Sequence, residues 1–109
     1  MASGSIKVHE DITNLNVTVN SNITVTQSSY IRMGKLYKFC ALFTPSANIA
    51  AFTSLFEIGE IIGRYAATAL YNRTDNNTSG MIYMQGNSSA IQCTSGLSKD
   101  KQYAFELII

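Results

Sequence analysis

Charged residues are scarce in this chain. Asp, Glu, Lys and Arg together make up 14% of its 109 residues, against about 25% in an ordinary globular domain. Eight basic and seven acidic residues leave a formal net charge of +1. Such a balance does not provide the strongly basic surface that binds a nucleic-acid backbone or an anionic membrane. We therefore expect no nucleic-acid partner.

The chain also lacks a long uninterrupted apolar run. Its most apolar stretch, residues 49–70, contains Glu57, Glu60 and Arg64, and charged side chains are costly at the centre of a bilayer. The first residues lack the basic and apolar regions of a secretion signal. We expect no membrane insertion, and we interpret residues 1–13 as a flexible lead-in or a remnant of cloning.

Residues that perform acid–base or nucleophilic chemistry are few. His9 is the only histidine and lies in a segment without clear patterning, so a Ser–His–carboxylate triad is not indicated. Glu57 and Glu60 are the closest pair of glutamates, and beside Gly59 we expect a solvated loop or a salt bridge with Arg64 rather than a glycosidase pair. We therefore expect no enzymatic activity.

Metal ligands and cross-links are equally sparse. Cys40 and Cys93 are the only cysteines and are far apart in the sequence, so we expect two buried, reduced thiols rather than a zinc site or a disulfide. Residues 75–80 resemble the start of a calcium loop, but position 86, where a bidentate glutamate is required, is Gly86. No cofactor is expected.

Uncharged polar residues take the place of the missing charges, with 12 serines, 10 threonines and 9 asparagines. Near the N-terminus they alternate with aliphatic residues over 15–19 and again over 23–26. A period of two is typical of a half-buried strand. With a turn at residues 20–22, this pattern predicts a β-hairpin that has one buried and one solvated face.

Two further segments read clearly as strands. Residues 36–44 (LYKFCALFT) are apolar on both faces except at Lys38, which predicts a strand covered on both sides, and Pro45 closes it because proline donates no ladder hydrogen bond. Residues 103–109 alternate apolar and other residues to the final position. We expect this closing strand to be paired and packed inside the structure.

The pattern of residues 49–71 fits two alternatives. Apolar residues recur near helical spacing there. Gly59 and Gly63 would each cost such a helix about 1 kcal/mol relative to alanine. The same residues also fit two strands, 51–58 and 64–72, joined by a loop bracketed by the two glycines. Local pattern alone leaves both readings open.

Turn residues separate the remaining short strands. They cluster at 72–80, 86–89 and 95–101, which predicts loops there. About eight short strands with turns every eight to twelve residues are typical of a β-sandwich or a jelly roll. We predict one all-β domain over residues 14–109, an antiparallel, jelly-roll-like β-sandwich.

Aromatic, glycine and turn positions recur in the middle and at the end of the chain. They lie in residues 30–36, 43–45, 47–51, 55–59, 82–91 and 103–109. In these positions, and over nearly the whole chain from about residue 15, the sequence resembles the C-terminal head domain of receptor-binding proteins. Those proteins form the tail fibres and baseplates of phages that infect Gram-positive bacteria.

The resemblance implies an all-β homotrimer that attaches to a host envelope saccharide without cleaving it. It implies a place in the virion, at the phage tail tip or baseplate, after assembly in the bacterial cytoplasm beside other virion tail proteins. It also favours strands over a helix in residues 49–71. The heptads of a trimeric stalk do not occur, so we expect a head separated from its stalk or a small stand-alone protein.

One polar loop has the composition of a sugar site. Sugars offer flat C–H faces and paired hydroxyls, which suit an exposed aromatic ring and planar polar groups. A tyrosine, a guanidinium, a carboxylate and amides occur together within seven residues. The candidate ligand-binding residues are Tyr71, Asn72, Arg73, Asp75, Asn76 and Asn77.

Two smaller pairs are second candidates, Tyr30 with Arg32 and Gln85 with Asn87. Tryptophan is absent, which favours a shallow, weak site whose avidity would come from trimeric valency. The alternatives are a structural baseplate or fibre module that binds another virion protein, and a small cell-wall hydrolase. The first would expose a large apolar patch without a polar pocket, and the second would need a cleft with a perturbed carboxylate.

Overall fold

Strands account for all the regular structure of residues 12–109, the part of the chain described by the computed structural model, with side chains described from residue 15. His9 and most of the predicted lead-in lie outside the described residues. The nine strands are β1 (Ile12–Asn14), β2 (Thr18–Val19), β3 (Ile23–Met33), β4 (Leu36–Pro45), β5 (Ser54–Glu57), β6 (Ala66–Asn72), β7 (Asn77–Met84), β8 (Ala90–Cys93) and β9 (Tyr103–Ile108). The prediction of an all-β, antiparallel domain is confirmed. No helix of the described part is long and apolar enough to span a bilayer.

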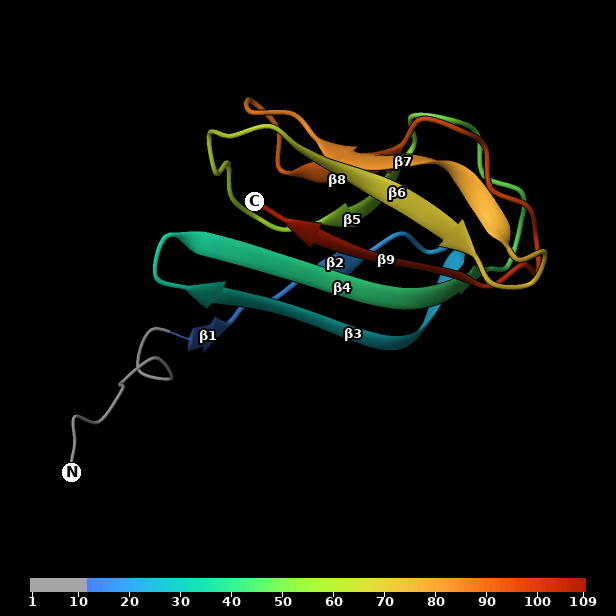
Figure 1. Cartoon of the computed structure of the whole chain (residues 1–109), viewed down its shortest axis with the longest axis horizontal. Helices are drawn as coiled ribbons and strands as arrows, with labels where there is room; N and C mark the ends of the chain where they lie inside the picture. The colour runs from blue at the N-terminus through green and yellow to red at the C-terminus, as the bar shows by residue number, and fades with distance from the viewer. Residues whose placement is uncertain (1–11) are drawn as a thin grey trace.

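The strands form one antiparallel sheet with the order β1-β3-β4-β9-β6-β7-β8-β5-β2. Figure 1 shows the sheet folded over into two layers, with β3, β4 and β9 facing β5, β6, β7 and β8. The two outermost strands, β1 and β2, belong to one short segment of chain, so the sheet nearly closes into a barrel. The sandwich predicted from the sequence is therefore a single sheet that packs against itself.

Aromatic side chains fill the space between the layers. Phe39 of β4 stacks on Phe105 of β9 with ring centroids 5.4 Å apart, and Phe43 lies edge-on to Phe56 at 5.5 Å. These rings are all at least nine-tenths buried. The two-residue alternation of β4 and β9 places every second side chain in this core. On the outer face of β4, Lys38, Cys40 and Leu42 are only half-buried. The sequence predicted a strand covered on both faces, but only the inner face of β4 is fully covered.

The prediction of a hairpin between residues 15–19 and 23–26 is wrong. Residues 12–14 pair with residues 31–33 of β3, whereas Thr18 and Val19 pair with β5. The turn at residues 20–22 is present, but it carries the chain from the β5 layer to the β3 layer. Asn20 directs this crossing because its backbone amide donates to Leu55 O at 3.0 Å and its side-chain amide donates to Ser54 O at 2.9 Å.

Residues 49–71 form strands, and the helical alternative is excluded. Gly59 and Gly63 adopt φ values of 80° and 86°, a left-handed conformation that ends a helix and suits a turn between strands. A β-bulge between Ser54 and Phe56 directs the adjacent side chains of Leu55 and Phe56 into the core. The spacing of apolar residues that resembled a helix therefore arises in part from the bulge in β5.

The loop predicted over residues 72–80 is shorter than expected. β7 begins at Asn77, which pairs with Asn72 across a tight hairpin. Asn76 takes a φ of 57°, which asparagine tolerates better than most residues. A bulge opposite Ala69 and Tyr71 absorbs the extra residue of β7. The polar residues that suggested a loop therefore lie on a strand and its turn.

The closing strand is paired and packed inside the structure, as predicted, and it has a partner on each side. β9 lies between β4 and β6, and Ile109 exchanges two backbone hydrogen bonds with Tyr37, at 2.8 and 3.0 Å. Arg64 links the β3–β4 turn to the C-terminal residue, because its Nη2 donates to Lys35 O at 2.6 Å and to Ile109 O at 3.3 Å. Arg64 thus binds backbone carbonyls rather than the glutamates considered from the sequence.

Gly80 is a position where the fold requires glycine. Its φ is 76°, and a Cβ there would lie 2.5 Å from Ser95 Oγ and 2.9 Å from Thr94 Oγ1. We expect Gly80→Ala to lower the free energy of unfolding by about 2 kcal/mol, because strain and overlap act together. Gly34 is the control, since its φ is 62° but no atom lies within 4 Å of its added Cβ. Chemical denaturation of both variants measures the difference, and equal losses would contradict the role of the overlap.

Candidate functional site

The predicted ligand-binding residues form the tip of the β6–β7 hairpin. The tip is tied to the chain just before β9, because Arg73 N donates to Gln102 O and Gln102 N donates to Thr74 Oγ1, each at 2.8 Å. β6 also pairs with β9 through Tyr71 and Asn72. The structure therefore brings the candidate residues together on a firmly anchored turn.

Asn72 is the structural anchor of this turn. It is 4% exposed, its Nδ2 donates to Asp75 Oδ2 at 3.0 Å, and its Oδ1 accepts from Asp75 N at 2.9 Å. Both ends of the amide are thus bonded within the turn. We assign Asn72 a positioning role beneath the surface rather than direct contact with a ligand.

Asp75 is exposed but already paired. Lys101 Nζ lies 2.7 Å from Asp75 Oδ1. Principally this bond, with a smaller contribution from Asn72, holds the pKa of the Asp75 carboxyl below its ordinary value of 3.8. Tyr71 donates its hydroxyl hydrogen to Asn76 Oδ1, so these two polar groups also satisfy one another.

The groups left free at the tip are one ring face, one guanidinium and one amide. Tyr71 is 41% exposed, and Arg73 and Asn77 are exposed. Within residues 12–109, neither the Arg73 guanidinium nor the Asn77 side-chain amide forms a hydrogen bond or an ion pair. These are the groups that a sugar needs for stacking and for bidentate hydrogen bonding.

The pH dependence of the turn follows from the depressed pKa of Asp75. A carboxyl whose folded-state pKa is lowered stabilises the fold above its unfolded pKa, and this contribution is lost as the pH falls through the folded value. We expect the melting temperature of the wild type to exceed that of Asp75→Asn at pH 6, and we expect this difference to shrink as the pH falls through the folded-state pKa of Asp75, which lies below 3.8. A constant difference over this range would exclude the ion pair as the cause.

The two second-candidate pairs lie elsewhere. Tyr30 is 4% exposed, and its hydroxyl has no hydrogen-bond partner among the described residues. Burial, followed by the negative charge of Glu60, raises its pKa well above the ordinary range. Tyr30 is thus a core residue, whereas Arg32, two residues further along β3, is exposed. Gln85 and Asn87 are both exposed in the β7–β8 turn.

Two hollows lie away from the hairpin tip. One, of about 370 Å³, lies along β3 and β4, and its lining includes Gln27, Cys40 and Phe105. The other, of about 320 Å³, lies at the seam between residues 15–19 and β3 and reaches Phe39. Neither hollow is lined by a candidate residue of the hairpin tip.

The chemistry of the thiols and carboxylates is unremarkable. Cys40 and Cys93 are free, and burial raises the pKa of both thiols, which makes them poor nucleophiles. Glu57 accepts a hydrogen bond from Ser89 Oγ. Among the described residues, no group of three or more His, Cys, Asp or Glu could hold a metal ion.

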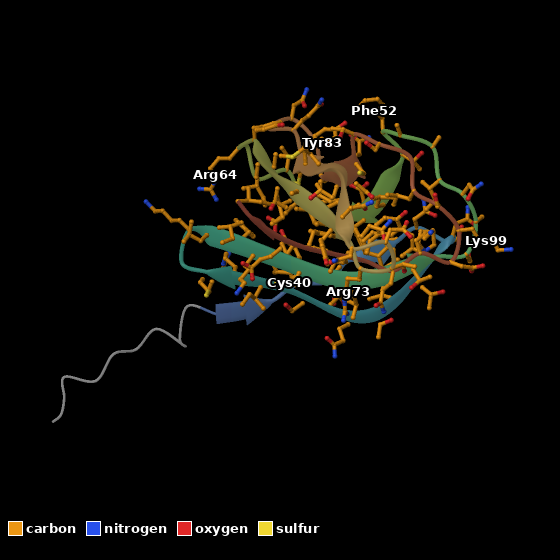
Figure 2. All side chains as sticks on the ribbon, turned by 45° about the vertical axis from the view of Figure 1, so that its right-hand side comes forward. Cys40, Phe52, Arg64, Arg73, Tyr83 and Lys99 are labelled. Atoms are coloured by element: carbon orange, nitrogen blue, oxygen red, sulfur yellow. The ribbon has the colours of Figure 1, made fainter. Side chains whose placement is uncertain are left out.

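A second exposed surface, which the sequence pattern did not single out, lies at the far end of β6 and β7 from the tip. Phe52, Tyr65 and Tyr83 form an aromatic cluster on the outside of the β6–β8 layer. In Figure 2, Phe52 and Tyr83 lie together, whereas Arg73 lies apart from them. The alternation of Tyr65, Ala67, Ala69 and Tyr71 was the available signal, since residues two apart on a strand share a face.

The fold and this surface define an all-β barrel with an open, uncharged aromatic face and a polar hairpin tip. Comparison of the chain with protein-family models, with curated proteins and with solved structures finds no match.

Proposed function

We propose that this protein is a non-enzymatic adhesion domain that binds a host envelope saccharide through the β6–β7 hairpin tip. The observation that carries the proposal is that Tyr71, Arg73 and Asn77 are all exposed within one short hairpin tip. Among the described residues, the Arg73 guanidinium and the Asn77 amide have no hydrogen-bond partner. The anchoring of the turn by Asn72 supports it, because a preorganised loop loses little entropy on binding.

The resemblance to phage receptor-binding heads supports a place for the domain in the virion, at the tail tip or baseplate. On this proposal the domain is a homotrimer, and other tail proteins are its neighbours. Leu36 and Ile108, which are 51% and 55% exposed, provide apolar surface for packing between copies. Three shallow sites acting together would raise the apparent affinity by roughly two to four orders of magnitude.

Purified Gram-positive cell walls are the first test. The domain is expected to sediment with the walls and to leave their turbidity unchanged, whereas a hydrolase would clear them. Light scattering is expected to give a mass near three times 11.9 kDa. A domain that does not sediment with the walls but binds other tail proteins would instead be a structural module of the baseplate or fibre.

A further inference from the structure

The outward face of β6 and β7 is mostly apolar, and Thr78, opposite Tyr71, is a polar member of it. The β-register places Ala67 opposite Tyr83 and Ala69 opposite Met81. Along β6 the residues two apart from Tyr65 to Tyr71 are exposed, whereas the residues between them are buried or half-buried. Six residues of strand span about 20 Å, so the face runs from the proposed hairpin-tip site to the far end of β6. Figure 1 shows β6 and β7 side by side over this length.

Three rings meet at the far end of this face. Tyr65 stacks on Tyr83 with centroids 6.5 Å apart and an interplanar angle of 27°, and Phe52 meets Tyr83 edge-on, also at 6.5 Å. Tyr83 is 8% exposed beneath its neighbours, while Phe52 is 59% and Tyr65 is 68% exposed. The outer two rings therefore offer most of their surface to solvent.

Phe52 is held outward by a strained backbone. Its φ is 66°, a conformation that costs a non-glycine residue about 1–3 kcal/mol. Its amide donates to Cys93 O, and its carbonyl accepts from Gln92 Nε2, both at 2.8 Å. These bonds fix the strained conformation, so that a large apolar side chain is kept exposed instead of packing in the core.

The size and charge of the face decide what it can bind. Its exposed aromatic and Met81 surface amounts to about 400 Å², given about 200 Å² for each large side chain, whereas a stable protein interface needs about 800 Å² per partner. The face is therefore too small to hold a second copy by itself. Between Tyr65 and Tyr71 the outward side chains carry no charge; they are Phe52, Tyr65, Ala67, Ala69, Tyr71, Thr78, Met81, Tyr83 and Gln92. Arg73, two residues beyond Tyr71, belongs to the hairpin tip.

We propose that this face binds consecutive sugar rings of one linear, uncharged polysaccharide, which runs along β6 from Tyr71 to Tyr65 and Phe52. Pyranose C–H faces suit exposed aromatic rings. Gln92 borders the rings, and its Nε2 is already bonded to Phe52 O. The site would then recognise an internal stretch of polymer rather than a chain end. This inference rests on the proposed saccharide-binding function.

The test uses neutral polysaccharide released from Gram-positive walls and separated into pools of two and of eight sugar rings. Calorimetry is expected to show that the wild type binds the eight-ring pool at least about tenfold more tightly, a difference of about 1.4 kcal/mol. The variant Phe52→Gly with Tyr65→Ser is expected to bind both pools equally, at the wild-type affinity for two rings. Both positions are exposed and glycine accepts the φ of residue 52, so folding is preserved; Val19→Ser is the control.

The outcomes separate this inference from the proposed function. Equal wild-type binding of both pools, or an unaffected double variant, overturns the extended face and leaves the hairpin tip as the site. Failure of the wild type to bind either neutral pool overturns the inference, and only failure to sediment with whole walls as well removes the proposed function. A fall in the solution mass of the double variant would identify the face as a contact between copies and would also overturn the inference.

Discussion

Replacement of Phe39 by alanine is expected to lower the free energy of unfolding by about 3–5 kcal/mol. Phe39 is 1% exposed and contacts aromatic rings from three other strands. Its centroid lies 5.0 Å from that of Phe56, 5.4 Å from that of Phe105 and 5.7 Å from that of Tyr30. The change therefore removes side-chain burial and leaves a cavity where the two layers meet.

A loss of this size is a large part of the 5–15 kcal/mol that stabilises a typical domain. Chemical denaturation followed by far-ultraviolet circular dichroism measures it. Leu42→Ala on the outer face of the same strand is the matched control, because Leu42 is only half-buried, and it is expected to cost much less. A Phe39→Ala variant with less than about 1 kcal/mol of destabilisation would show that the core repacks freely.

The second large effect is expected on binding. The variant Tyr71→Ser with Arg73→Ala removes the exposed ring and the free guanidinium of the tip while it leaves the Asn72–Asp75–Lys101 contacts in place. Loss of a charged hydrogen bond and a stacking contact is expected to cost at least about 2 kcal/mol per site, which is roughly a 30-fold weaker affinity for cell walls. Avidity would enlarge this loss in a trimer.

Wall sedimentation and thermal melting of the same preparation separate binding from folding. Lys99→Ala, at an exposed position in another loop, is the control for lost positive charge and is expected to bind normally. Undiminished wall binding by a folded Tyr71→Ser, Arg73→Ala variant would place the site elsewhere on the molecule. Asp75 is left unchanged because its ion pair with Lys101 supports the turn.

In the candidate site, composition identifies the segment, whereas the structure shows which of its side chains are free to bind. Composition alone selected the segment from Tyr71 to Asn77 as rich in groups that bind sugars. It did not separate Arg73, which is free, from Asn72, which is buried, or from Asp75, which is paired. Those roles depend on Lys101 and Gln102, which are about 26 to 30 residues away in the chain, and no local pattern indicates such partners.

The strands themselves were largely predictable because side-chain alternation is a local property. Residues 36–45 and 103–108 alternate strongly, and each forms a central strand. Around Leu55 and Phe56 the alternation fails, since a β-bulge sends two successive side chains inward. A bulge is decided by the partner strand, so the sequence left a helix open where the structure has a strand.

What the sequence by itself determined is the class of the protein: poor in charged residues, rich in strands, and with an apolar C-terminal strand. Only the tertiary structure decided that residues 12–19 divide their pairing between β3 and β5, and that Phe52 meets Tyr83 outside the barrel. The physical reason is that strand formation depends on neighbours two residues apart, whereas pairing and surface clusters depend on which distant segments meet when the sheet closes on itself.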